Sequence, residues 1–255
     1  SLHDALPISN DTEARLILAE LSILGDNWTL AQEHGDAVME LAPESTRAQI
    51  IATALAYRDA ILDENERDRA EAVARARALE DSQPDSLINA SIIVDSLMLD
   101  EDYEAALAKL DDVQQRFPQE RRFYQMRLTA HGRLGDDAGI EETLRRMISV
   151  YPEDTSIATS LLSFYSDRGD IDGAERFLRD RITPGERDDA ARLSVVQFLN
   201  AARGPEAAMD EAARYIEEGT NDDLFRAIHA SLLYDSGQRA EALREFEDIV
   251  RNAEP

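Results

Sequence analysis

The chain has 255 residues, 53 of them acidic and 27 basic, and its formal net charge at pH 7 is -26. A surface this acidic should repel phosphate backbones, which argues against a nucleic-acid partner. The absence of cysteine excludes disulfides, thiolate metal sites and cysteine nucleophiles. No apolar run approaches the roughly 18 residues of a membrane span, so we expect no membrane-spanning helix in this sequence.

The basic residues are almost all of one type. Because Lys109 is the only lysine, the other 26 of the 27 basic residues are arginines. This bias favours a GC-rich bacterial genome. The alternative is a halophile, since a high-salt cytoplasm screens the self-repulsion of an acidic chain.

Residues 1–9, SLHDALPIS, have no initiator methionine and fit no part of the pattern that follows. We interpret them as a non-native or disordered leader and leave them out of the fold prediction. At the other end, Pro255 falls where a repeat closes, which suggests a piece of a longer array.

A small residue recurs every 34 residues from about residue 11 onward. Steps of 34 from Ala106 reach Ala72, Ile140, Ala174, Ala208 and Ala242, and a further copy lies at Ala31. A second set follows four residues later at Gly35, Ala76, Leu110, Leu144, Leu178, Ala212 and Phe246. Four residues are about one helical turn, so each pair of positions shares one helix face. The period predicts paired helices, about seven times over.

The predicted repeats span residues 11–43, 44–84, 85–118, 119–152, 153–186, 187–220 and 221–255. The second is seven residues longer, which is about two helical turns, so its helices can lengthen without rotating their apolar faces. The extra residues lie around 61–69, ILDENERDR, and we expect a charged corner there that projects from the array.

Two repeats depart from the pattern. Ile140 replaces the small residue in the fourth repeat, which predicts looser packing. In the fifth, Arg181 occupies an expected apolar position and Pro184 and Gly185 follow early. We therefore expect the second helix of that repeat to end near Arg181. Residues 182–188 should then form a soft joint, that is, a flexible connection between repeats.

A 34-residue unit with a small residue opening its second helix and proline at its end (Pro43, Pro84, Pro118, Pro152) resembles the tetratricopeptide repeat (TPR). The resemblance implies an all-α fold, a right-handed superhelical α-solenoid of about seven repeats, forming a single domain over residues 10–255. The runs LAPESTRAQIIATALAYRDAIL and AARGPEAAMDEAARYIEEG look most like repeat-rich lipoproteins of Gram-negative bacteria. That implies a lipid-anchored periplasmic protein with an assembly or export role, and a cytoplasmic adaptor is the alternative.

Tetratricopeptide solenoids bind extended peptides or helices of other proteins on first-helix residues of the concave side. The resemblance places eight candidate binding residues there: Arg47, Tyr57, Arg58, Asp95, Met98, Arg122, Gln125 and Arg133. Their arginines contrast with the acidic chain, and guanidinium groups bind carboxylates by charge-assisted contacts. We expect a scaffold that binds an acidic-hydrophobic segment of a partner protein. The alternative is that these arginines pair with neighbouring acids of the chain.

Catalytic motifs are missing from the sequence. It has no nucleophile elbow, paired-histidine helix or phosphate-cradling glycine loop. His131 and His229 fall on first helices, where a packed or groove-lining histidine is more frequent than a catalytic base. We expect a chain that is not an enzyme and binds no cofactor or metal, with a regulatory module of a larger enzyme as a distant alternative.

Overall fold

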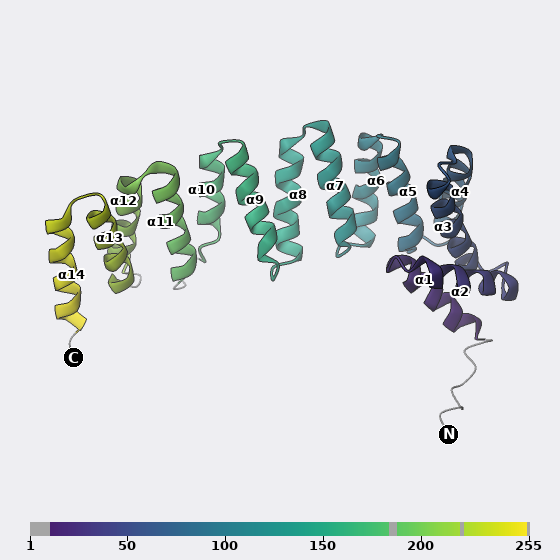
Figure 1. Ribbon diagram of the computed structural model, residues 1–255, viewed down its shortest axis with the longest axis horizontal. Helices are drawn as coiled ribbons and strands as arrows, with labels where there is room; N and C mark the ends of the chain where they lie inside the picture. Colours follow the sequence, from purple (N-terminus) through teal and green to yellow (C-terminus); the bar gives the residue numbers. More distant parts are fainter. Residues whose placement is uncertain (1–10, 184–187, 220–221, 254–255) are drawn as a thin grey trace, which may run out of the picture. The chain divides into compact units, whose positions relative to one another are not determined.

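The structure is a computed structural model that describes residues 11–183, 188–219 and 222–253. All regular elements in these ranges are α-helices (Figure 1). They are α1 (Thr12–Leu24), α2 (Trp28–Leu41), α3 (Thr46–Leu62), α4 (Glu66–Glu80), α5 (Leu87–Leu99), α6 (Tyr103–Arg116), α7 (Arg121–Leu134), α8 (Asp137–Val150), α9 (Thr155–Asp167), α10 (Ile171–Asp180), α11 (Asp189–Arg203), α12 (Pro205–Glu217), α13 (Asp222–Asp235) and α14 (Arg239–Ala253). The predicted all-α class is confirmed. Across the described ranges, no helix combines the length and hydrophobicity needed to cross a membrane.

The helices form antiparallel pairs within two compact units, one ending at Glu153 and the other beginning at Asp154. In each unit a second helix packs on its own first helix and on the first helix of the following pair, as α4 does on α3 and α5. This is the packing of an α-solenoid. The single domain over residues 10–255 stays a prediction, and the proposed leader, residues 1–9, lies outside the described residues.

Aspartate side chains cap the N-termini of several second helices and account for part of the acidic excess. Asp102, Asp136 and Asp170, which follow the 34-residue interval, each accept a hydrogen bond from the backbone N–H three residues on, at 3.2, 3.0 and 2.8 Å. Such caps satisfy amides that have no partner in the helix, and an anion there also favours the positive end of the helix dipole. At the next step of 34, Gly204 has no side chain to offer, and Pro205 starts the helix instead.

The small residues of the 34-residue pattern are buried as predicted. Six alanines of the first set are at most 4% exposed: Ala31, Ala72, Ala106, Ala174, Ala208 and Ala242. Burying a residue this small lets two helix backbones approach closely, so a larger side chain at these positions should force the pairs apart.

The fourth pair makes its close approach one residue earlier than predicted. Ile140 is half-buried, whereas Gly139 is buried. A Cβ atom at Gly139 would overlap the ring of His131 on α7. His131 is itself 9% exposed, and its Nδ1 lies 2.8 Å from a carboxylate oxygen of Asp136. The packing here is therefore close, because the preceding glycine replaces the alanine seen elsewhere.

The seven extra residues of the second pair are shared between its helices. α3 has 17 residues against 13 in α5, and Ala72 is the seventh residue of α4, whereas Ala106 is the fourth of α6. The expected charged corner is thus reduced to the turn before Glu66, because an added helical turn extends α3 through Leu62. In the fifth pair, α10 ends at Asp180 with Arg181 as its cap, which confirms the expected end. Residues 184–187 of the proposed soft joint lie outside the described residues.

Candidate binding groove

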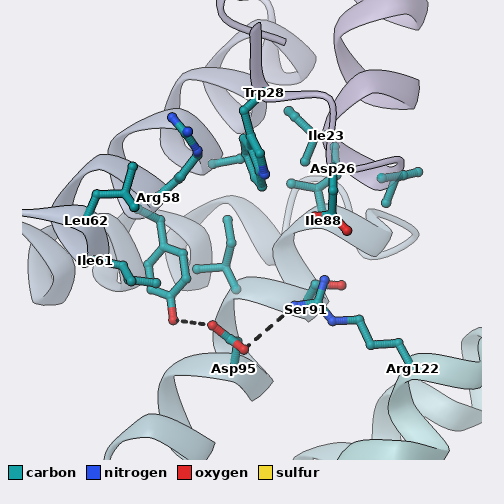
Figure 2. Close-up of a pocket in the computed structure, with 14 residues that line it drawn as sticks. Ile23, Asp26, Trp28, Arg58, Ile61, Leu62, Ile88, Ser91, Asp95 and Arg122 are labelled. Atoms are coloured by element: carbon teal, nitrogen blue, oxygen red, sulfur yellow. Dashed lines mark hydrogen bonds and ion pairs between the residues drawn. The ribbon is translucent and has the colours of Figure 1, made fainter. Parts of the chain in front are cut away.

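A pocket of about 360 Å³ lies in the first unit, where the first helices α1, α3 and α5 contact one another (Figure 2). This volume falls in the range of sites that take small ligands or side chains. Most of its lining is apolar: Ile23, Leu24, Trp28, Ala54, Ile61, Leu62, Ile88 and Ile92. The polar and charged lining residues are Asp26, Tyr57, Arg58, Ser91, Asp95 and Arg122.

Asp95 on α5 connects two other first helices across the pocket. The hydroxyl of Tyr57 on α3 donates a hydrogen bond to its Oδ2 atom at 2.9 Å, and the Nη2 atom of Arg122 on α7 lies 3.7 Å from its Oδ1 atom (Figure 2). Burial, and then the charge of Asp95, raise the pKa of the Tyr57 hydroxyl far above its usual value. Tyr57 therefore remains a proton donor at any ordinary pH.

Arg58 and Trp28 form the opposite side of the pocket (Figure 2). The guanidinium carbon of Arg58 lies 5.2 Å from the centre of the Trp28 ring, a distance at which the ring face attracts a cation. Its Nη1 atom is also 3.4 Å from a carboxylate oxygen of the adjacent Asp59. The side chain of Arg58 is 34% exposed and that of Arg122 is 52% exposed, so both arginines can still reach a ligand.

Three apolar side chains of the pocket are open to solvent. Leu24, Ile61 and Leu62 are 48%, 38% and 64% exposed. Ile61 and Leu62 belong to the additional turn of α3, so the longer second repeat builds one wall of the pocket. Exposed apolar groups gathered around a concavity mark surfaces that bind other molecules.

A second pocket of about 420 Å³ adjoins the first, and both include Leu24 and Ile88 in their lining. Arg47 lies in this second pocket, where its Nε and Nη2 atoms bind the two carboxylate oxygens of Glu20 at 2.7 Å each. Its Nη1 atom binds Glu13 at 2.6 Å. These hydrogen bonds raise the pKa of Arg47 above its already high value. Both acids are on α1, so Arg47 joins α3 to α1.

The structure brings together four of the eight predicted residues. Tyr57, Arg58, Asp95 and Arg122 line the first pocket, whereas Arg47 lies in the adjoining one. The other three do not line either pocket. Met98 packs beside the apolar cluster around Leu110, and Gln125 and Arg133 are exposed on α7.

Sequence reasoning missed the part of the pocket that comes from the first repeat and from the extra turn. Trp28 is the single tryptophan of the chain, and the 34-residue pattern does not single it out. Here it is half-buried with one face toward Arg58. The apolar pair at 61 and 62 was grouped with the charged residues that follow it. An exposed apolar pair at the end of an unusually long helix was the available signal.

The second unit has a larger, less charged pocket of about 610 Å³ between α9, α10 and α11. Small and hydroxyl side chains form much of its lining, and its one charged residue, Asp170, accepts a hydrogen bond from the Gly173 backbone at 2.8 Å. Among the described residues, no group of three or more histidine, aspartate or glutamate side chains could hold a metal ion. The first pocket is therefore the better candidate for charge-dependent recognition.

No family model and no curated protein matches this sequence. Solved structures share this fold. The antiparallel helix pairs that repeat every 34 residues identify it. It is the fold of the tetratricopeptide-repeat proteins. A structure of Naa15/Naa10 bound to HypK has a TM-score of 0.51 and 13% identity over 95% of this chain. This chain spans only 36% of that protein's length.

Two smaller bacterial proteins also resemble this chain in fold. PilF of Pseudomonas aeruginosa matches with a TM-score of 0.49 and 13% identity, over 81% of this chain and 90% of that one. TTC0263, a thermophilic TPR protein of Thermus thermophilus, matches with a TM-score of 0.45 and 15% identity, over 74% and 99% of the two chains. At such identities the likeness concerns the fold alone.

Proposed function

We propose that the chain is a protein-interaction scaffold that holds an acidic-hydrophobic segment of a partner protein in the pocket between α1, α3 and α5. One observation carries the proposal: an apolar concavity with solvent-exposed Leu24, Ile61 and Leu62 lies between two accessible arginines, Arg58 and Arg122. Apolar side chains of the partner fill the concavity, and carboxylates beside them meet the guanidinium groups. The Naa15/Naa10 structure contains a bound protein, HypK, and its likeness in fold supports a role in binding proteins.

The geometry at Arg122 suits a carboxylate supplied from outside. Its 3.7 Å separation from Asp95 is long for a charge-assisted hydrogen bond, which is about 2.7 to 2.9 Å. A guanidinium group has five N–H donors, so a partner carboxylate can bind Arg122 without displacing Asp95. Arg58 is held over Trp28, which reduces the conformational entropy lost when it binds a ligand.

The apolar contacts carry most of the affinity. Exposed ion pairs contribute only about 0.2 to 1 kcal/mol each, and the net charge of -26 repels an acidic ligand at long range. We therefore expect modest affinity that depends on the leucine and isoleucine side chains of the pocket, with the arginines selecting the charge of the partner.

Selection from a displayed library of random peptides tests the proposal with a defined probe. The native chain should enrich peptides in which large apolar residues alternate with aspartate or glutamate. Leu62→Asp should weaken the binding of the selected peptides by about tenfold or more, which is equivalent to about 1.4 kcal/mol of binding free energy. The double variant Arg58→Glu plus Arg122→Glu should select basic-hydrophobic peptides instead, because the charges flanking the pocket are reversed.

Matched controls separate recognition from general damage. Leu41→Asp changes a leucine of α2 that is 48% exposed, and Arg75→Glu changes an exposed arginine of α4; neither residue lines the pocket. Both controls should bind the selected peptides as the native chain does, with the same melting temperature. Failure to enrich acidic-hydrophobic peptides, or equal losses in the controls, would overturn the proposal.

A further inference from the structure

The turns within the first three helix pairs carry exposed leucines. From α3 to α8, such turns lie along one edge of the first unit, opposite the connections between pairs (Figure 1). α1, α3 and α5 each end in a leucine, and these side chains are 48%, 64% and 52% exposed: Leu24, Leu62 and Leu99. Repeats stack face to face along an array, so neighbouring repeats cover the faces of α3 to α6 and leave this edge open.

An acidic residue follows each of these leucines where the backbone of the turn is left-handed. Asp26, Glu64 and Glu101 lie two residues after the leucines and two residues before the second helices. Their φ values are 55°, 53° and 57°. Within the described ranges they are the residues other than glycine with positive φ. A left-handed residue with a side chain costs free energy that glycine avoids.

Later pairs of the array have glycine at this position and lack the leucine. In the fourth, fifth and seventh pairs the residues are Gly135, Gly169 and Gly237, all with positive φ. The residues two before these glycines are Arg133, Asp167 and Asp235. The exposed leucine and the strained acid therefore occur together. Backbone strain of this kind is concentrated at functional sites.

Helix capping does not account for the acids. The side chains of Asn65 and Asp102 already cap α4 and α6, and each accepts a hydrogen bond from a backbone amide at 3.2 Å. Glu64 and Glu101 are exposed, and neither carboxylate has a hydrogen-bond or ion-pair partner in the described part of the chain. Both are available to a ligand.

The turns of the second and third pairs lie side by side. Arg69 on α4 donates hydrogen bonds to Asp100 at 2.6 Å and to Ser96 at 3.3 Å, which joins the start of α4 to the end of α5. Packed helices have axes about 8 to 10 Å apart, and seven residues of a helix rise about 10.5 Å. A partner helix lying along the edge can therefore present every seventh residue to successive turns.

The charge of this edge selects a basic partner. Residues 62–69, LDENERDR, contain four acids and two arginines, and residues 99–104, LDEDYE, contain four acids and no basic residue. One of the two arginines, Arg69, is bound to Asp100. An anionic membrane surface is repelled by such an edge, whereas a basic segment is attracted to it.

We propose that the edge formed by Leu62, Glu64, Leu99 and Glu101 binds a basic amphipathic helix of a partner protein. Apolar side chains of that helix cover the two leucines, and arginine or lysine side chains beside them bind the two carboxylates. Glu64, Leu99 and Glu101 do not line the groove pockets, and Leu62 alone is shared with them. The edge takes a ligand of the opposite charge, so this inference is independent of the proposed function.

Two synthetic helical peptides test the proposal: one repeats leucine and arginine every seventh residue, and the other has glutamate in place of arginine. The native chain should bind the arginine peptide at least about tenfold more tightly, and added salt should weaken that binding. Glu64→Gly plus Glu101→Gly should weaken it by about threefold to tenfold. The melting temperature of this double variant should not fall, because glycine relieves the left-handed backbone. A merely structural role of the acids would change stability and leave binding unchanged.

Leu99→Ser should weaken the binding of the arginine peptide by about tenfold, because an apolar contact is lost. Leu41→Ser and Asp81→Asn are matched controls at exposed positions of the opposite edge, where α2 and α4 end. Both should bind that peptide as the native chain does. Arg58→Glu plus Arg122→Glu, which alters the groove, should not weaken this binding, so the two proposals can fail separately. Equal binding of the two peptides, native affinity in Leu99→Ser or in the glycine double variant, or losses in the controls would overturn the proposal.

Discussion

Tyr57 on α3 donates a hydrogen bond to the carboxylate of Asp95 on α5 at 2.9 Å, and the other oxygen of that carboxylate faces Arg122 on α7 at 3.7 Å. One buried hydroxyl thus fixes the anion that lies nearest the accessible arginine of the pocket. Any change in this hydrogen bond should affect both the packing of the first helices and the charge that a ligand meets.

Replacement of Tyr57 by phenylalanine should lower the stability of the first unit by about 1 kcal/mol, the usual contribution of one hydrogen bond. Asp95 can then pair more closely with Arg122, so acidic peptides should also bind more weakly. Hydrogen exchange of α3 and α5 measures the first effect, and peptide titration measures the second. Tyr234→Phe, at a side chain that is 45% exposed, should change neither. Unaltered exchange in α3 and α5 would show that the Tyr57 hydrogen bond does not hold the helices together.

Alkaline pH should destabilise the protein through its buried tyrosines. Burial raises the pKa of Tyr57 and of Tyr215 in the folded chain, whereas a tyrosine in the unfolded chain titrates near pH 10. The unfolded state therefore loses these protons first, so the stability they contribute is complete below about pH 10 and declines as the pH rises above it. Denaturant titrations from pH 8 upward should show this decline. Tyr57→Phe should flatten it in the first unit, and a decline of native steepness in that variant would contradict the assignment.

Glu211 should make the second unit sensitive to acid. Burial opposes its ionisation, but Arg179, at 2.7 and 3.0 Å, and Arg214 lower its pKa to about 2. Its contribution to stability is therefore complete above its unfolded pKa, near 4.5, and is lost as the pH falls toward 2. Each unit of pKa shift corresponds to about 1.4 kcal/mol, so ionised Glu211 contributes roughly 3 kcal/mol to the free energy of unfolding.

Glu211→Gln should destabilise the second unit at neutral pH and remove much of its pH dependence between about 4.5 and 2. Hydrogen exchange of the α10 and α12 amides reports this locally, which matters because a chain with two units need not unfold in one step. Glu217→Gln, at an exposed position of the same helix, should retain the native pH profile. An unchanged profile in Glu211→Gln would show that this carboxylate does not couple folding to pH.

Two glycines of the fourth pair should respond to alanine in opposite directions. A Cβ at Gly139 would overlap the His131 ring, whereas one at Gly132 on α7 would meet nothing within 4 Å. Gly139→Ala should destabilise the pair by about 1 to 3 kcal/mol through overpacking. Gly132→Ala should stabilise it by about 0.5 to 1 kcal/mol, because alanine restricts the unfolded chain and favours helix. Chemical denaturation of both variants checks the signs, and equal effects would refute close packing at Gly139.

The repeat pattern predicted the helix pairs because it depends on local spacing. A small residue such as Ala106 must recur on the same helix face in every unit, and the sequence records that interval directly. The same register placed Tyr57, Asp95 and Arg122 on successive first helices, where their side chains contact one another although their positions within the repeats differ. The end of α10 near Arg181 was also predictable, because a proline follows closely.

The remaining features depend on contacts between residues far apart in the sequence. Arg47 was assigned to the groove by its helical position, but its partners Glu13 and Glu20 lie 34 and 27 residues away on α1. The part of the pocket built by Ile61 and Leu62 was missed for a related reason. An inserted turn changes which side chains reach a neighbouring helix, and the spacing alone does not reveal on which side of the turn the extra residues fall.

Arg47→Gln should affect the attachment of α1 and leave peptide binding intact. The guanidinium of Arg47 binds Glu20 and Glu13 at 2.6 to 2.7 Å, and its side chain is 28% exposed, so the loss should be about 1 kcal/mol. In Arg47→Gln, amide hydrogen exchange in α1 should accelerate. Arg122→Gln should instead weaken the binding of acidic peptides and leave exchange in α1 unchanged. Arg75→Gln, which removes an exposed pair within α4, should do neither. If Arg47→Gln instead weakened peptide binding and left α1 exchange unchanged, Arg47 would be a ligand-binding residue, and the groove would extend into the second pocket.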